Sequence, residues 1–134
     1  MKRVTALMVN QYKIKELGFD FMGYTFANKN NLSYHHLIIP KRLGGPMTVE
    51  NGAVLARNTA HDYIHRIEPI DPEIFAFITS EMIDENISGR LDTRNIKRIH
   101  DVLKYFEKEH CADTLRSGAP LIPDAYIRRR IREY

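Results

Sequence analysis

Histidines in this chain are concentrated in one segment, where their spacing suits metal chemistry. Four of the six lie between residues 34 and 68, as the adjacent pair His35 and His36 and as His61 and His65, which are four residues apart. Residues four apart on a helix share one face, with about 5–6 Å between their Cβ atoms, so His61 and His65 can bind a single cation together. The spacing therefore predicts a pair of metal ligands on a helix.

The adjacent pair implies two different roles. Side chains alternate between the two faces of a strand, so His35 and His36 are expected to point in different directions and not to share one ion. One of them, added to the helical pair, completes a three-imidazole site that leaves positions open for water or substrate, as catalytic metal sites do. The other, with an unperturbed pKa of about 6.5, can take a proton from water at neutral pH.

The segments around the adjacent histidines have the composition of a β-hairpin. Residues 32–39 are rich in strand formers and are followed by a proline, and residues 52–56 form a second short apolar run after a glycine-rich loop. Residues 19–26, with aromatics at alternating positions, also favour a strand, and the polar residues 27–31 favour a turn.

Helical periodicity and capping residues predict four helices around this hairpin. Their expected bounds are 3–17, ended by Gly18; Asn58 or Thr59 to Pro69, carrying His61 and His65; Asp71 to about Ser88, ended by Gly89; and Asp92 to about His110. The expected fold class is therefore α+β, as a mainly helical single domain over residues 1–134. Its core covers about 32–68, its helical flanks 3–17 and 72–110, and its basic tail 120–134.

The charge balance permits nucleic-acid binding without requiring it. The chain carries 20 Lys and Arg against 17 Asp and Glu, with a net charge of +3 and a pI near 9.0. Basic residues beside the histidines or clustered near the C-terminus are expected to hold phosphates, with an ordinary solvated surface as the alternative. These residues are Lys41, Arg42, Arg128, Arg129, Arg130 and Arg132.

Other features of the composition narrow the setting. No apolar run approaches the about 18 residues of a membrane span, and the first twenty residues lack the pattern of a signal peptide. We therefore expect a cytoplasmic protein with no membrane partner. The single Cys111 excludes an intrachain disulfide and a multi-cysteine zinc site within one chain, so a metal would be bound by histidine or carboxylate.

The order of these residues, "HHLIIPKRLGG" followed by "ENGAVL" and a helix with two histidines, resembles the HNH nucleases, which are built on the ββα-metal motif. The histidines four apart are most similar to the colicin-type DNase branch. The resemblance covers about residues 32–68, and it implies a central ββα-metal hairpin and helix. The roles that it implies are metal ligand for His35, His61 and His65, general base for His36, and orientation of the loop and the base for Asn51.

One departure from the family pattern concerns a second metal. Many HNH proteins carry CxxC pairs that bind a structural zinc, whereas Ala56 and Thr59 stand where one such pair would begin. No structural zinc is expected here.

The resemblance implies a metal-dependent endonuclease that hydrolyses DNA phosphodiester bonds to 5′-phosphate and 3′-hydroxyl ends, using one divalent ion: zinc, nickel, cobalt, manganese or magnesium. Three neutral imidazoles favour zinc, nickel or cobalt in affinity. The alternative is a catalytically inactive nucleic-acid-binding or assembly protein on the same fold, as in a phage or mobile element. The sequence leaves open a homo-oligomer and a phage or host protein partner.

Overall fold

A computed structural model of the chain describes residues 3–110, which have an α+β architecture with a two-stranded antiparallel sheet. The α-helices are α1 (Arg3–Gln11), α2 (Ile14–Leu17), α3 (Ala60–Ile70), α4 (Pro72–Ser88) and α5 (Thr93–His110), and the strands are β1 (Leu32–His36) and β2 (Gly52–Ala56). Short 3-10 turns, η1 (Lys29–Asn31) and η2 (Lys41–Leu43), flank β1. The predicted fold class, α+β and mainly helical, is confirmed for these residues.

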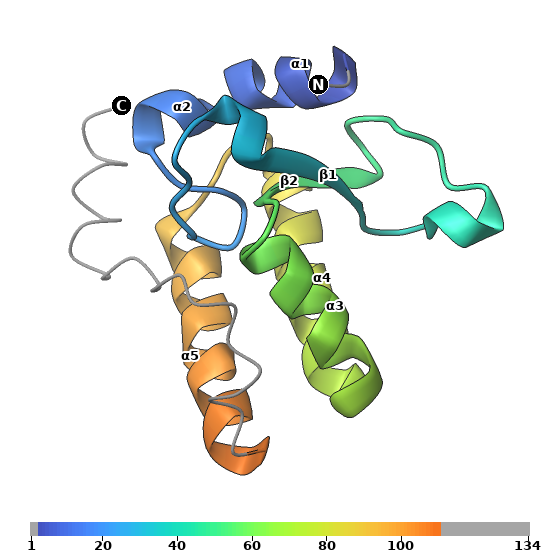
Figure 1. Cartoon of the computed structure of the whole chain (residues 1–134), viewed down its shortest axis with the longest axis vertical. Helices are drawn as coiled ribbons and strands as arrows, with labels where there is room; N and C mark the ends of the chain where they lie inside the picture. Colours follow the sequence, from blue (N-terminus) through green and yellow to red (C-terminus); the bar gives the residue numbers. More distant parts are fainter. Residues whose placement is uncertain (1–2, 111–134) are drawn as a thin grey trace.

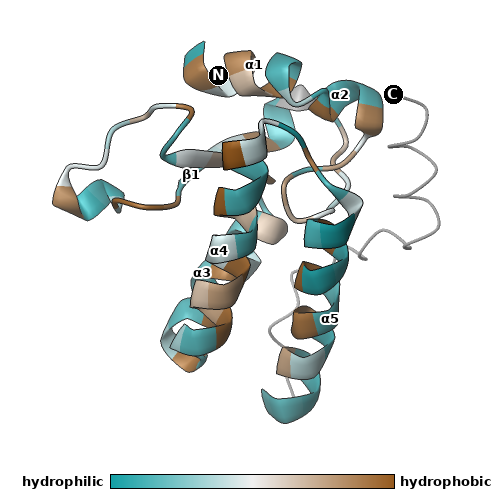
Figure 2. Cartoon of the chain, turned by 180° about the vertical axis from the view of Figure 1, so that it is seen from behind, coloured by the Kyte–Doolittle hydropathy of each residue, from teal (hydrophilic) through white to brown (hydrophobic). Residues whose placement is uncertain are grey.

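The sheet lies between two groups of helices (Figure 1). The helices α1 and α2 lie on one side of it, whereas α3, α4 and α5 extend away from the other side, and the loop of residues 37–51 projects outward from the strands. Figure 2 shows hydrophobic residues recurring along the helices between hydrophilic ones. The apolar faces meet in a core that includes Ile64 and Ile67 of α3, Ile78 and Met82 of α4, and Ile99, Leu103 and Phe106 of α5.

The strands pair in the antiparallel manner that was expected, with Leu32 opposite Ala56 and His36 opposite Gly52. The predicted first strand, 32–39, is too long, because β1 ends at His36. Beyond that point the N–H groups of Ile38 and Ile39 donate to the amide side chain of Asn51 instead of pairing with a strand. Gly52 has no room for a side chain, since a Cβ atom there would lie 2.0 Å from the ring of Tyr34.

The first predicted helix, 3–17, is not continuous. The helix breaks between α1 and α2, where Lys13 adopts a left-handed conformation with φ of 55°. The break lets the buried Tyr12 donate a hydrogen bond of 2.5 Å to Asn86 Oδ1 on α4, and it places Ile14 in the core. The predicted end at Gly18 is confirmed, with φ of 84° and its N–H bonded to the carbonyl of Ile14.

The predicted strand over 19–26 is also wrong. This segment is a series of turns around the wholly buried carboxylate of Asp20, which accepts hydrogen bonds from the N–H groups of Met22, Tyr24 and Ala56 at 2.7–2.9 Å. Residues 19–24 are all buried, so the alternating exposure of a half-buried strand is absent from them. The buried carboxylate competes with a strand for the backbone N–H groups.

The three remaining helices agree with their predicted bounds. The Asp71 side chain accepts from the N–H of Ile74 and caps α4, and Gly89 ends this helix in a left-handed conformation. The helix α3 continues one residue past Pro69. The basic tail predicted at 120–134 and Cys111 lie outside the described residues. Within residues 3–110, no helix is long and apolar enough to cross a membrane.

Candidate metal centre

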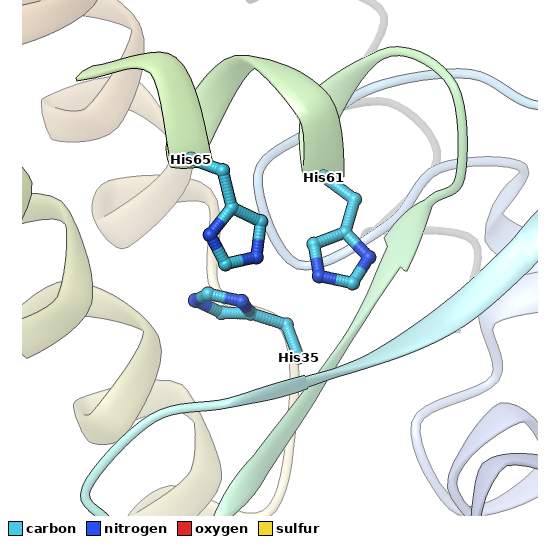
Figure 3. A group of neighbouring side chains, drawn as sticks. All are labelled: His35, His61 and His65. Atoms are coloured by element: carbon cyan, nitrogen blue, oxygen red, sulfur yellow. The ribbon is translucent and has the colours of Figure 1, made fainter. Parts of the chain in front are cut away.

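The three histidines predicted as metal ligands lie together in the structure (Figure 3). His35 comes from β1, and His61 and His65 come from consecutive turns of α3. One ring nitrogen of each histidine can be chosen so that all three atoms lie within 4.8 Å of one another. The predicted pair on a helix and its partner on a strand are therefore brought to one point.

The three rings surround a common centre. The ring centroid of His35 lies 5.1 Å from those of both His61 and His65, which lie 4.9 Å from each other. The rings of the two helical histidines are inclined by 33°, and both stand nearly perpendicular to the ring of His35. An ion at this centre would meet nitrogen donors from two elements, with its remaining positions directed away from the protein ligands.

Burial favours the neutral form of two of these imidazoles, those of His35 and His61. Burial, followed by the neighbouring charges of His61 and His65, lowers the pKa of His35 to about 3. Burial, followed by the charge of His65, lowers the pKa of His61 to about 4. A metal ligand must be unprotonated, so both residues have the required form at neutral pH.

A polar atom without a partner supports the fit of an ion at this cluster. His35 is 3% exposed, and its Nε2 atom is buried without a hydrogen-bond partner among the described residues. An unsatisfied buried polar atom costs about 1–3 kcal/mol. The donor set is three imidazoles, which suits a first-row transition ion better than magnesium.

His36 lies apart from this cluster. It points to the other face of β1, where its ring packs edge-on against Tyr34 with 4.9 Å between the ring centroids. The Tyr34 hydroxyl is itself held by a 2.6 Å hydrogen bond to the carbonyl of Thr48. The Nε2 atom of His36 is buried and has no hydrogen-bond partner among residues 3–110. The expected separation of His35 and His36 is thus present, while the assignment of His36 as general base stays a prediction.

Asn51 uses its whole amide group to hold the loop of residues 37–51. Its Oδ1 atom accepts from the N–H groups of Ile38 and Ile39 at 3.0 and 2.8 Å. Its Nδ2 group donates to the carbonyls of Ile39 and Pro46, each at 3.0 Å. The backbone carbonyl of Asn51 also accepts from the N–H of Leu37, the residue after His36. Asn51 therefore orients the loop, as expected, and holds the backbone beside His36.

The histidines line a cavity of about 660 Å³ whose walls carry basic residues. Lys41 and Arg42 line it, as predicted, and so do His36 and Tyr34 from the second face of β1. The sequence analysis missed Ser33, Arg57 and Glu68, which also line this cavity. Strand alternation from His35 could have indicated Ser33, and helical spacing from His65 could have indicated Glu68, whereas no local pattern marks Arg57.

Of the residues predicted to contact phosphates, some lie at the cavity and the others lie outside the described residues. Lys41 and Arg42 stand at the cavity, in the turn η2. The arginines of the predicted basic tail, Arg128, Arg129, Arg130 and Arg132, lie outside the described residues.

Comparisons with protein-family models, with curated proteins and with solved structures gave no match for this chain.

Proposed function

We propose that this protein is a metal-dependent endonuclease of the HNH type, which hydrolyses phosphodiester bonds of DNA. The observation that carries the proposal is the convergence of His35, His61 and His65, from a strand and a helix, in a cavity with cationic walls. In this proposal β1, β2 and α3 form the ββα-metal motif, and the three histidines bind one divalent ion.

The basic residues of the cavity suit an anionic substrate. Lys41, Arg42 and Arg57 all line the cavity. The guanidinium group of Arg57 donates a 3.3 Å hydrogen bond to the carbonyl of Leu32. We assign these cations to the phosphates that flank the scissile bond. The bound ion supplies charge stabilisation at the scissile phosphate.

His36 is proposed as the general base. It lines the same cavity as the histidine cluster. A neutral imidazole can remove the proton from the attacking water. Asn51 fixes the backbone after His36 and so limits the positions that the imidazole can adopt.

Relaxation of supercoiled plasmid tests this function. Protein freed of metal should be inactive, and added zinc, nickel, cobalt, manganese or magnesium should be compared for recovery of nicking. Replacement of His61 and His65 together by alanine should abolish both metal binding and cleavage. His110→Ala is the matched control, because that histidine pairs with Asp71 at the start of α4, away from the cavity lining.

The ends of the products give a second check. A nick with 5′-phosphate and 3′-hydroxyl ends is sealed directly by DNA ligase, so ligation should restore the closed plasmid. DNA binding and metal binding without any cleavage would reject the nuclease and favour the alternative of an inactive nucleic-acid-binding or assembly protein.

A further inference from the structure

Ser33 contacts one of the three clustered histidines through its side chain. It lies two residues before His35 on β1, so both side chains belong to the same face of the strand. Its Oγ atom is 2.6 Å from Nδ1 of His61, and the same Oγ atom is 3.4 Å from the backbone carbonyl of Leu55 on β2. The hydroxyl therefore contacts both the imidazole of His61 and the backbone of β2.

One arrangement of donors and acceptors satisfies both contacts of the Ser33 hydroxyl. The serine hydroxyl has one proton to donate, and the carbonyl of Leu55 can only accept. When the hydroxyl donates to this carbonyl, it accepts the N–H of His61 at Nδ1. A neutral imidazole has a single N–H, so the Nε2 atom of His61 is then unprotonated.

The second nitrogen of His61 faces the other two histidines. In Figure 3 one ring nitrogen of His61 is directed toward His35 and His65, and the other is directed away from them. The nitrogen that points away is the one engaged by Ser33. The hydrogen bond thus leaves the lone pair on the nitrogen that faces the cluster.

We propose that Ser33 is a positioning residue of the metal centre, which holds His61 as the Nδ1–H tautomer and directs its unprotonated Nε2 atom at the ion. The inference rests on the metal site of the proposed function but not on DNA cleavage. Hydrogen bonds of this kind fix the tautomer and the ring orientation of histidine ligands, and removing such a partner typically lowers metal affinity about 10–100-fold.

Two substitutions separate the hydroxyl from the rest of the side chain. Ser33→Ala should lower zinc affinity about 10–100-fold, since it removes the acceptor for the Nδ1–H of His61. Ser33→Thr keeps a hydroxyl, and a β-branched residue is favourable in a strand, so its zinc affinity should stay close to that of the parent. Ser80→Ala is the matched control, because Ser80 Oγ likewise donates to a backbone carbonyl, that of Phe77, on α4.

The tautomer itself can be measured by nitrogen NMR of the imidazole rings in metal-free protein. We expect His61 to show protonated Nδ1 and bare Nε2 in the parent and in Ser33→Thr, and to lose this preference in Ser33→Ala. The ring signals of His65 provide an internal reference, because the hydroxyl of Ser33 bonds to the ring of His61. Zinc titration against a competing chelator, and the visible spectrum of the cobalt-loaded protein, report the affinity and the geometry of the site.

Each outcome bears on the inference. A parent protein with Nε2 protonated on His61, or a Ser33→Ala variant that folds and binds zinc as tightly as the parent, overturns it. Failure of the parent to bind zinc overturns both the inference and the metal centre of the proposed function. Tight zinc binding with the expected tautomers, but without plasmid cleavage, rejects the nuclease and leaves the role of Ser33 supported. If Ser33→Ala does not fold, the parent and Ser33→Thr measurements still decide the tautomer.

Discussion

His35 and His36 are neighbours in sequence, yet their surroundings differ. His35 is almost wholly buried and faces the two histidines of α3, whereas His36 faces Tyr34 on the opposite side of β1. Removing each ring should therefore have different consequences. A ligand contributes to holding the ion, while a general base contributes to proton transfer and leaves the ion in place.

Alanine substitutions test this difference. His36→Ala should retain metal and DNA binding but lose about 10²–10⁴-fold in cleavage rate, the usual contribution of a positioned general base. His35→Ala should instead weaken metal affinity, and part of its activity should return at high metal concentration. Calorimetric metal titration and single-turnover cleavage at a pH above 7 measure both effects. Cleavage by His36→Ala at the parent rate would contradict the assignment, as would an equal loss of metal by both variants.

At the scale of elements, the side chain of Asn51 binds the backbone of the loop of residues 37–51 at several points. The amide of Asn51 makes four hydrogen bonds to the backbone of this loop, and Gly45 approaches so closely that a Cβ atom there would lie 1.9 Å from the carbonyl of Ile39. The loop carries Lys41 and Arg42, so the order of the loop determines the position of the cationic wall.

Asn51→Ala should loosen this loop before it affects the helices. The substitution removes the side-chain partner of the backbone N–H groups of Ile38 and Ile39, and each one that stays buried costs about 1–3 kcal/mol. Amide hydrogen exchange at Ile38 and Ile39 should become faster, and urea should unfold the protein at a lower concentration. Asn30→Ala, an exposed asparagine in the turn before β1, is the control and should change neither measurement. Unchanged exchange at Ile38 would show that the loop does not depend on this amide.

The elements that could be predicted from the sequence are those whose signals are local. Asp71, Pro72 and Gly89 bracket α4 within a few residues of its ends. The four-residue spacing of His61 and His65 likewise indicated that these two rings would meet. The errors arise where distant residues decide. Tyr12 reaches Asn86, 74 positions along the chain, and so favours a break between α1 and α2.

Contacts between distant residues also explain why the strand predicted over 19–26 is wrong and why Arg57 was not predicted at the cavity. The carboxylate of Asp20 binds the backbone of Ala56, 36 positions away, which no alternation of aromatics could indicate. Arg57 follows β2 directly and reaches the cavity only because the strands pair. The division between general base and ligand came from the family resemblance rather than from any physical pattern in the sequence.

At the scale of the whole molecule, a carboxyl group is buried where α4 packs against the rest of the fold. Glu85 is wholly buried, and neither of its carboxylate oxygens has a hydrogen-bond partner among residues 3–110. Burial raises the pKa of Glu85 well above its usual value, and the nearby charges of Asp20, Asp92 and Glu81 raise it further. Burial likewise raises the pKa of Asp20 to about 7.

Replacing Glu85 by glutamine should stabilise the protein at neutral pH. The folded state holds the proton of Glu85 above pH 4.5, where the unfolded chain releases it, so the stability of the parent falls as pH rises from 4.5 toward the folded pKa. Glutamine has no such proton, so the difference in free energy of unfolding between variant and parent should be small near pH 4.5 and grow with pH. Each unit of raised pKa contributes about 1.4 kcal/mol to that difference.

Urea unfolding of both proteins between pH 4.5 and 8 measures this difference. The buried His35 and His61 have lowered pKa values and act in the opposite direction, but they are present in both proteins and cancel. Glu109→Gln, on the exposed side of α5, is the control and should show little dependence on pH. A Glu85→Gln variant whose advantage does not change with pH would show that Glu85 titrates normally in the folded protein.

The clustered histidines come from two separate elements, β1 and α3, so an ion bound by all three would link these elements. His35 and His61 are joined in the unfolded chain by a long flexible segment, and only the folded chain holds them together. An ion that binds the folded state alone adds about 2.7 kcal/mol of stability at a free concentration 100 times its dissociation constant. If the proposed site binds its ion, folding and metal uptake are coupled, so the midpoint of unfolding should rise with the free concentration of the ion.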